Sequence, residues 1–302
     1  MKNATLRQLR IFAEVAKSLN FSRAAERLHL TAPAVSQQIK ALEDHAGCLL
    51  FLRTGKQVQL SIQGEYLLVH VNRILAEVKS AENTLIGLQN LQTGTLTIGM
   101  VSTAEYFVPS LLAKFTREHP GIEIKLVVGN REQLSQWLED YDVDVAVMGR
   151  APQNTQCKAE PFAVHPHVFI AAAQHPAAQA PINPSLFQQY GFISREHGSG
   201  TRAAAKDFFD HQRIEPKIIM EMHSNETIKQ AVMAGMGVSF VSKHTIALEL
   251  KNNLLTILPL TGTPILRSWS IVTPEGKTLS PGAEAFRYFA LEHGESHLET
   301  LF

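Results

Sequence analysis

The 302-residue sequence contains only two cysteines, Cys48 and Cys157. Two cysteines exclude a multi-disulfide framework and a metal site built from several thiolates, so we expect both to be buried free thiols. The sequence also lacks an apolar run near the roughly 20 residues that a membrane helix needs, and its start, MKNATLRQLRIF, lacks the apolar stretch of a signal peptide. These absences predict a cytoplasmic protein with no membrane partner.

The sequence has no low-complexity tract and no net charge, with 28 basic and 28 acidic residues. A chain of 302 residues is too long for one compact core and suggests two or three domains. The charge is unevenly distributed, because residues 1–60 hold nine Lys or Arg against four Asp or Glu, and the rest holds 19 against 24. A basic N-terminal module on an acidic body favours contact with nucleic acid.

The segment FSRAAERLHLTAPAVSQQIKALE, residues 21–43, follows a first helix that should end near residues 18–20. Ser22 suits the N-cap of a second helix, and Thr31 suits that of a third, with Pro33 in its first turn. Because Pro33 has no N–H, Thr31 should accept from the N–H of Ala34. Val35 and Ile39 then belong to the buried side of the third helix. Two helices joined by a tight turn predict a helix-turn-helix.

The other side of the third helix carries Ser36, Gln37 and Lys40, which can hydrogen-bond to base edges or phosphates in the major groove. The segment LFLRTGKQVQL, residues 50–60, predicts a β-hairpin wing whose cations can contact phosphates. A helical hairpin that binds nothing, with ordinary solvated charges, is the alternative. The predicted DNA contacts are Ser22, Thr31, Ala32, Pro33, Ser36, Gln37, Lys40, Arg53 and Lys56.

The whole module, LRQLRIFAEVAKSLNFSRAAERLHLTAPAVSQQIKALEDHAGCLLFLRTGKQVQLSIQGEYLL, resembles the winged helix-turn-helix of LysR-type transcriptional regulators. It departs from the usual pattern at Leu52, where an acidic residue is common, and at SIQG, which replaces Thr-Glu-Ala-Gly. The resemblance implies double-stranded promoter DNA as a partner, with RNA polymerase recruited or excluded there.

Residues 61–91 contain no proline and repeat apolar residues at helical spacing, which predicts one helix of about 30 residues, or about 45 Å. Its apolar stripe favours dimerisation. The resemblance implies the same, with dimers pairing into a homotetramer. We assign residues 1–60 to the DNA-binding domain and residues 61–92 to a linker and dimerisation helix.

After Gly94 the pattern alternates between short apolar runs, such as TLTIGM and VDVAVMG, and helical segments, which predicts an α/β fold with a parallel sheet. Two such lobes would form a cleft at the ends of strands. FTREHPGIEIKLVVGNREQLSQWLEDYDVDVAVMG resembles the effector domain of LysR-type regulators, which is similar to periplasmic solute-binding proteins. The expected effector domain is 93–302, with lobe I about 93–162 and 268–302, and lobe II about 163–267.

Candidate effector contacts lie where strands end. Ser102 and Thr103 can bind a ligand oxygen or cap a helix, and Asn225 leaves the same two alternatives open. The loop REHGSGTR offers free amides at a helix start, and Arg202 adds a bidentate donor, which together favour an anion site over a simple turn. Arg150 could close on the ligand from the other lobe or be an ordinary surface residue. The set is Ser102, Thr103, Arg150, Ser199, Gly200, Thr201, Arg202 and Asn225.

Enzyme and transport functions are poorly supported. His165 and His167 alternate along a strand without a carboxylate or cysteine at ligand spacing, so no metal is expected. Ser199 lies in Gly-Ser-Gly, which is not a nucleophile elbow, and no Walker or dinucleotide fingerprint indicates a cofactor. A periplasmic transport protein would explain two lobes but not the helix-turn-helix.

Two segments, FISREHGSGTR and SNETIKQAVMAGMGVSFVS, resemble the LysR-type branch that activates Calvin-cycle carbon-fixation operons. That resemblance implies effectors that are phosphorylated or anionic metabolites, such as ribulose bisphosphate, phosphoenolpyruvate or NADPH. A LysR-type regulator of another operon, with an aromatic or amino-acid effector, is the alternative.

Overall fold

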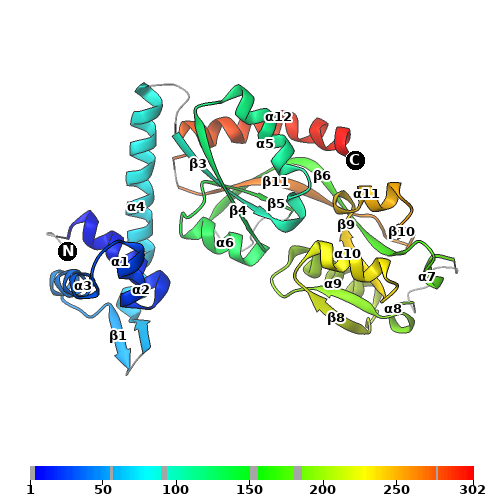
Figure 1. The fold of residues 1–302 in the computed structure, drawn as a ribbon, viewed down its shortest axis with the longest axis horizontal. Helices are drawn as coiled ribbons and strands as arrows, with labels where there is room; N and C mark the ends of the chain where they lie inside the picture. Colours follow the sequence, from blue (N-terminus) through cyan, green and yellow to red (C-terminus); the bar gives the residue numbers. More distant parts are fainter. Residues whose placement is uncertain (1–3, 55–56, 90–93, 150–155, 180–185, 277) are drawn as a thin grey trace. The chain divides into compact units, whose positions relative to one another are not determined.

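The computed structural model describes residues 4–54, 57–89, 94–149, 156–179, 186–276 and 278–302 (Figure 1). The chain divides into two compact units, Met1–Leu85 and Ile86–Phe302, which are described in turn.

The first unit opens with three helices, α1 (Leu6–Ser18), α2 (Phe21–Arg27) and α3 (Ala32–Ala46). Thr31 caps α3 by accepting from the N–H of Ala34 at 3.4 Å, as predicted. The prediction that Ser22 caps α2 is wrong, because the N-cap is Asn20, whose side chain accepts from the N–H of Arg23 at 3.1 Å. The three helices bury one apolar core that includes Phe12, Val15, Ala24, Val35, Ile39 and Leu42.

A hairpin and a long helix complete this unit. Strands β1 (Phe51–Thr54) and β2 (Gln57–Leu60) pair antiparallel, as the wing prediction requires. Helix α4 (Ile62–Gln89) has 28 residues, close to the expected length. Its first turns pack on the helical core through Leu67, Leu68 and Val71.

The second unit is built on a nine-stranded sheet. Eight strands follow the order β4-β3-β5-β11-β6-β9-β7-β8, and β10 pairs with β6 beside them. The strands are β3 (Gly94–Val101), β4 (Ile122–Gly129), β5 (Val145–Met148), β6 (Cys157–Ala172), β7 (Phe192–Arg195), β8 (Ile218–Met222), β9 (Val238–Ser242), β10 (Leu255–Leu258) and β11 (Ile265–Pro274). The helices are η1 (Ser102–Ala104), α5 (Val108–Glu118), α6 (Arg131–Glu139), α7 (Pro176–Gln179), α8 (Leu186–Gln189), α9 (Gly200–Gln212), α10 (Asn225–Met233), η2 (Lys243–Thr245), α11 (Ala247–Lys251) and α12 (Pro281–Leu301).

The predicted parallel sheet is found at its two ends but not in its middle. Strand β3 pairs parallel with β4 and β5, and β7 pairs parallel with β8 and β9. Strands β6 and β11 instead pair antiparallel with each other. The chain leaves the first group of strands through β6 and returns through β11, so the two strands run in opposite directions.

The first lobe comprises β3, β4, β5, α5, α6 and α12 with the adjoining halves of β6 and β11. Along β5, Val145 and Val147 face the core under α5 and α12, whereas Ala146 and Met148 face α6. Figure 1 shows α5 and α12 on one side of these strands and α6 on the other. Alternate side chains of a strand point to opposite faces, so β5 needs apolar residues throughout.

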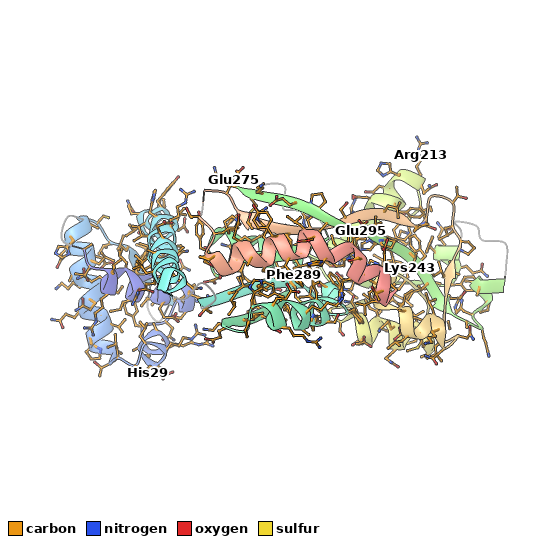
Figure 2. All side chains as sticks on the ribbon, turned by 90° about the horizontal axis from the view of Figure 1, so that it is seen from above. His29, Arg213, Lys243, Glu275, Phe289 and Glu295 are labelled. Atoms are coloured by element: carbon orange, nitrogen blue, oxygen red, sulfur yellow. The ribbon has the colours of Figure 1, made fainter. Side chains whose placement is uncertain are left out.

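The second lobe comprises β7 to β10 and α9 to α11 with the other halves of β6 and β11. Phe169 of β6 packs with Phe208 and Phe209 of α9, whereas the neighbouring Val168 and Ile170 pack with α10. Figure 2 shows the end of α12 close to Lys243 of this lobe, and the ring of Phe302 lies 4.8 Å from that of His244. Strands β6 and β11 and helix α12 therefore all reach both lobes.

The two cysteines are free, as predicted, but both are half-buried rather than fully buried. No helix within the described ranges is long and apolar enough to cross a membrane.

Candidate functional site

The outer face of α3 presents the polar side chains that the sequence placed there. Gln37 and Lys40 are exposed and Ser36 is half-buried, whereas Val35 and Ile39 on the opposite side are fully buried. In the turn before them, Thr31 and Pro33 are exposed and Ala32 is half-buried, and Ser22 is exposed on α2. The structure thus gathers one polar face at the start of α3.

The wing is fixed to α3 by a contact that sequence reasoning missed. Glu43 Oε1 accepts from the backbone N–H of Leu50 at 2.8 Å and of Phe51 at 3.2 Å, which ties the start of β1 to the last turns of α3. The backbone of Arg53 lies in β1 opposite Val58. Lys56 lies outside the described residues.

A pocket of about 30 Å³ lies between the two lobes of the second unit, where parallel strands end. The first lobe contributes Ser102, Thr103, Asn130, Arg131 and Gly149. The second contributes Arg195, Ser199, Gly200 and Thr201, and the crossing strands contribute His165, His167 and Arg267. Five predicted effector residues, Ser102, Thr103, Ser199, Gly200 and Thr201, are therefore brought together here.

Two helices start at this pocket. Asn130 caps α6 by accepting from the N–H of Gln133, and Ser199 caps α9 by accepting from the N–H of Arg202. Free N–H groups and the helix dipole give each N-terminus a partial positive charge. Gly198 has φ of +80°, a conformation that favours glycine, and it lies in the second-lobe loop close to Asn130 and Glu132 at the start of α6.

Arg195 is the central cation of the pocket and was missed in the sequence. Its side chain is buried, and it forms an ion pair with Glu196 at 2.7 Å. It also donates to Asn225 Oδ1 at 2.6 Å and, across the lobes, to Ser102 Oγ at 3.2 Å. Arg195 ends a parallel strand, so the strand-end rule that selected Ser102 could have found it.

Arg202 and Asn225 support the pocket from behind rather than lining it. The Arg202 guanidinium donates to the Arg195 carbonyl at 3.1 Å and pairs with the Glu221 carboxylate. Asn225 bonds to Arg195 and donates to Ser102 Oγ at 3.3 Å. Ser102 and Asn225 do not act as helix caps, which was one of the two roles considered for each. Helix η1 has no side-chain cap, and α10 is capped by Ser224. Arg150 lies outside the described residues.

The rest of the missed residues come from crossing strands and from the start of α6. Arg267 lies opposite His165 in the β6–β11 register and donates to the Gly200 carbonyl at 3.2 Å, so it holds the start of α9. Arg131 is the first residue of α6. These two arginines and Arg195 give the pocket three cations, and no carboxylate side chain is among its described lining residues. Arg195 is paired with Glu196, and Arg267 lies 3.6 Å from the Asp207 carboxylate outside the lining.

The surroundings of the two lining histidines favour their neutral form. Burial lowers the pKa of His165 well below its usual range, and the neighbouring His167, His244 and Arg267 lower it further. Burial and Arg267 lower the pKa of His167 to about 3. The His165 ring stacks on Trp269 at 3.7 Å, and its Nε2 lies 2.9 Å from Ser242 Oγ. Within the described part of the chain, no group of three or more His, Cys, Asp or Glu is placed to hold a metal ion.

A second contact joins the lobes beside the pocket. Tyr106, which follows η1 in the first lobe, hydrogen-bonds to Glu226 of α10, and burial together with that carboxylate raises the pKa of its hydroxyl. The buried Lys229 Nζ lies 4.8 Å from the centre of the Tyr106 ring, and pairs with Glu226 at 2.7 Å and with Glu249 at 2.9 Å.

Known protein families match both units. The family described as a bacterial regulatory helix-turn-helix protein of the lysR family matches residues 6–65, and the LysR substrate binding domain matches residues 89–295. The chain belongs to the LysR family of transcriptional regulators. This confirms the resemblance drawn from the helix-turn-helix and effector-domain motifs.

Relatives within the LysR family cover nearly the whole chain. The HTH-type transcriptional regulator CfxR of Cupriavidus necator is 46% identical over 97% of this chain and 93% of its own. The RuBisCO operon transcriptional regulator of Allochromatium vinosum is 43% identical over 96% of each chain. The solved regulatory domain of Synechocystis CcmR in complex with 2-PG is 35% identical, with a TM-score of 0.63, over 66% of this chain and 97% of that one. The predicted similarity to the carbon-fixation branch is confirmed.

Proposed function

We propose that this LysR-type protein regulates carbon-fixation genes by binding promoter DNA and sensing a small anionic metabolite between its effector lobes. The observation that carries the sensing role is the pocket itself. Three arginines and two helix N-termini converge there, and no carboxylate side chain is among the described lining residues. Such a site favours a phosphate or carboxylate over a neutral ligand.

The comparisons support the same assignment. Relatives are named as regulators of the RuBisCO operon, and the CcmR domain was solved with 2-PG. These names make carbon-fixation operons the proposed target and 2-PG a first ligand to test. Since the relatives are transcriptional regulators, we propose no catalytic activity for this chain.

Residues 1–60 would bind DNA, residues 61–92 would link and dimerise, and residues 93–302 would bind the effector, with lobe I about 93–162 and 268–302 and lobe II about 163–267. The exposed apolar side chains Ile62, Tyr66 and Val69 follow one face of α4 and support dimerisation, because such a row is stabilised when a second helix covers it. Dimers pairing into tetramers, a cytoplasmic location and contact with RNA polymerase belong to the same proposal.

Ligand binding is tested by thermal unfolding of the full-length protein with sulfate, phosphate, 2-PG, sugar phosphates and aromatic acids. A ligand at 100 times its Kd adds about 2.7 kcal/mol of stability, so a bound anion raises the midpoint clearly. Each variant is compared with and without ligand. In Arg195→Met the anion should no longer raise the unfolding midpoint, whereas in Arg202→Met it should still raise it. A shift with aromatic acids alone would contradict the anionic effector.

DNA binding is tested by fluorescence anisotropy with promoter fragments at several salt concentrations. Gln37→Ala should relax base preference, because its amide can pair with an adenine edge. Arg53→Ala should weaken binding to every sequence and reduce the salt slope by about one, as expected for a phosphate contact. Equal loss of specificity in both variants would contradict this division of roles.

A further inference from the structure

One residue, Glu43, organises the turn between helix α3 and the wing. Its backbone carbonyl accepts from the N–H groups of Gly47 at 2.8 Å and Cys48 at 3.3 Å, where α3 ends. Its carboxylate accepts from the N–H groups of Leu50 at 2.8 Å and Phe51 at 3.2 Å, where the wing begins. Glu43 therefore receives four backbone N–H groups of this turn.

The carbonyl side of the same turn is held by the residue that precedes α4. The hydroxyl of Ser61 donates to the Leu49 carbonyl at 2.7 Å, and its N–H donates to the Leu50 carbonyl at 2.9 Å. A Cβ built on Gly64 would lie 2.2 Å from the Leu50 carbonyl oxygen, so α4 passes this turn with no room for a side chain. Residues 49–51, called the wing root below, are thus held from two sides.

Apolar packing fixes the wing root as well. Leu50 and Phe51 are 1% and 4% exposed. The ring of Phe51 lies 5.4 Å from that of Phe12 and 5.7 Å from that of Phe21. The hydrogen bonds and these ring contacts together give the wing root one defined position relative to α3.

The position of the wing root determines where the wing meets DNA. Ser36 and Lys40 of α3 line the same groove as Leu49 of the wing root, so the predicted base-reading face adjoins it. Arg53 is the second residue after Phe51 in β1. A hydrogen bond to a phosphate oxygen tolerates only a few tenths of an ångström, so a shifted wing root would break this contact while α3 stays in the major groove.

A carboxylate beside a DNA-binding face needs a reason, because it repels phosphates. Glu43 is half-buried three residues after Lys40, and its neighbour Asp44 is exposed. Repulsion alone predicts that removing either carboxylate tightens DNA binding. A positioning role predicts the opposite for Glu43 when its hydrogen bonds to the wing root are lost.

We infer that Glu43 is a positioning residue for DNA binding, which holds the wing root at the distance from α3 at which one chain contacts bases and phosphates together. This inference rests on the proposed function, in which the wing cations Arg53 and Lys56 contact phosphates. It adds the residue that couples those contacts to α3.

The test is fluorescence anisotropy of the full-length protein with a DNA duplex of mixed sequence at several salt concentrations, since phosphate contacts supply nearly all such binding. Glu43→Leu should raise the Kd about five- to tenfold for each lost phosphate contact at about 0.1 M salt, and lower the salt slope by about one. Glu43→Gln keeps an oxygen that can accept both N–H groups, so it should bind at least as tightly as wild type. Asp44→Asn, the matched control, should do the same.

A double-mutant cycle shows whether Glu43 acts through the wing. Arg53→Ala/Lys56→Ala removes the wing cations. Adding Glu43→Leu to this background should change the Kd by less than about twofold, because no wing contact is left to lose. Effects that multiply in full would place the role of Glu43 elsewhere and overturn the inference.

A second variant covers the case in which circular dichroism shows that Glu43→Leu folds poorly. Ser61→Ala removes the hydroxyl that holds the Leu49 carbonyl, so it loosens the wing root from the side of α4. It should weaken DNA binding in the same way, and again have little effect in the background without the wing cations.

The outcomes separate this inference from the function on which it depends. Wild-type affinity in Glu43→Leu and Ser61→Ala, or equal weakening in Glu43→Gln and Glu43→Leu, overturns the positioning role and leaves the wing contact intact. An unchanged Kd and salt slope in Arg53→Ala/Lys56→Ala overturns the proposed wing contact itself, and the inference with it.

Discussion

Replacing Arg195 by methionine tests whether the buried guanidinium holds the two lobes together. Arg195 and Glu196 are both about 5% exposed, and the pair is joined at 2.7 and 2.9 Å. Arg195→Met would leave the Glu196 carboxylate buried without its cation. Breaking a buried pair in this way costs about 3–5 kcal/mol. The Ser102 and Asn225 side chains would lose a donor as well.

The matched control is Arg202→Met, seven residues along the chain. The Arg202–Glu221 pair has side chains 33% and 45% exposed, so water screens both charges. Exposed pairs contribute about 0.2–1 kcal/mol, so this variant should lose less than 1 kcal/mol. The double variant Arg195→Met/Glu196→Leu should recover much of the loss, since removing both charges leaves no unpaired ion.

Urea unfolding followed by tryptophan fluorescence is the assay. Both tryptophans, Trp137 and Trp269, lie in the unit Ile86–Phe302, so their emission reports this unit and not the DNA-binding unit. A loss below about 1 kcal/mol for Arg195→Met, or one equal to that of Arg202→Met, would refute the argument that burial makes the first pair structurally important.

Three further changes have definite expectations. Thr31→Ala should cost about 1 kcal/mol in urea unfolding followed by circular dichroism, because the cap of α3 is lost; Ser22→Ala, which removes no cap, is the control. His167 has a pKa of about 3 in the folded protein against an ordinary 6.5, so the unfolded chain binds more protons between these values. The free energy of unfolding that the neutral His167 contributes is complete above pH 6.5 and is about 2 kcal/mol smaller at pH 5. In His167→Gln, urea unfolding should show a loss of stability between pH 7 and pH 5 that is smaller by this amount. Gly149→Ala should destabilise the unit Ile86–Phe302 in urea unfolding followed by tryptophan fluorescence, because the new methyl group would lie 2.5 Å from His165 Nδ1; a free energy of unfolding equal to wild type would contradict this.

Local sequence patterns were sufficient to predict most of the secondary structure of the DNA-binding unit. Apolar periodicity and the Thr31 cap depend on residues within one or two helical turns, so they can be read without the fold. The error at Ser22 has a long-range cause. The ring of Phe21 packs on Phe51 of the wing at 5.7 Å, which places Phe21 inside the helix and makes Asn20 the cap.

The sequence predicted only some of the residues of the effector pocket. The predicted ones lie at strand ends, whereas the others are placed by strand pairing. Ser102 and Ser199 follow parallel strands, where sequence alone locates a ligand edge. Arg202 is the third residue of α9, and the pairing of β7 with β8 brings Glu221 to its guanidinium, so the side chain turns away from the pocket. The position of Arg267 in the pocket depends on its antiparallel register with His165. The first pairing joins Arg195 to Met222, 27 positions along the chain, and the second joins His165 to Arg267, 102 positions along, so no local pattern encodes either.

The construction of the pocket explains how binding can be coupled to movement of the lobes. Its walls come from both lobes, and Arg195 bridges them by donating to Ser102. The free space of about 30 Å³ is small for an organic phosphate, so we expect its entry to move the walls apart. A ligand shifts such an equilibrium only by its differential affinity for the two arrangements. Because the anion would compete with Ser102 of the first lobe for Arg195 of the second, its binding energy depends on the relative positions of the two lobes.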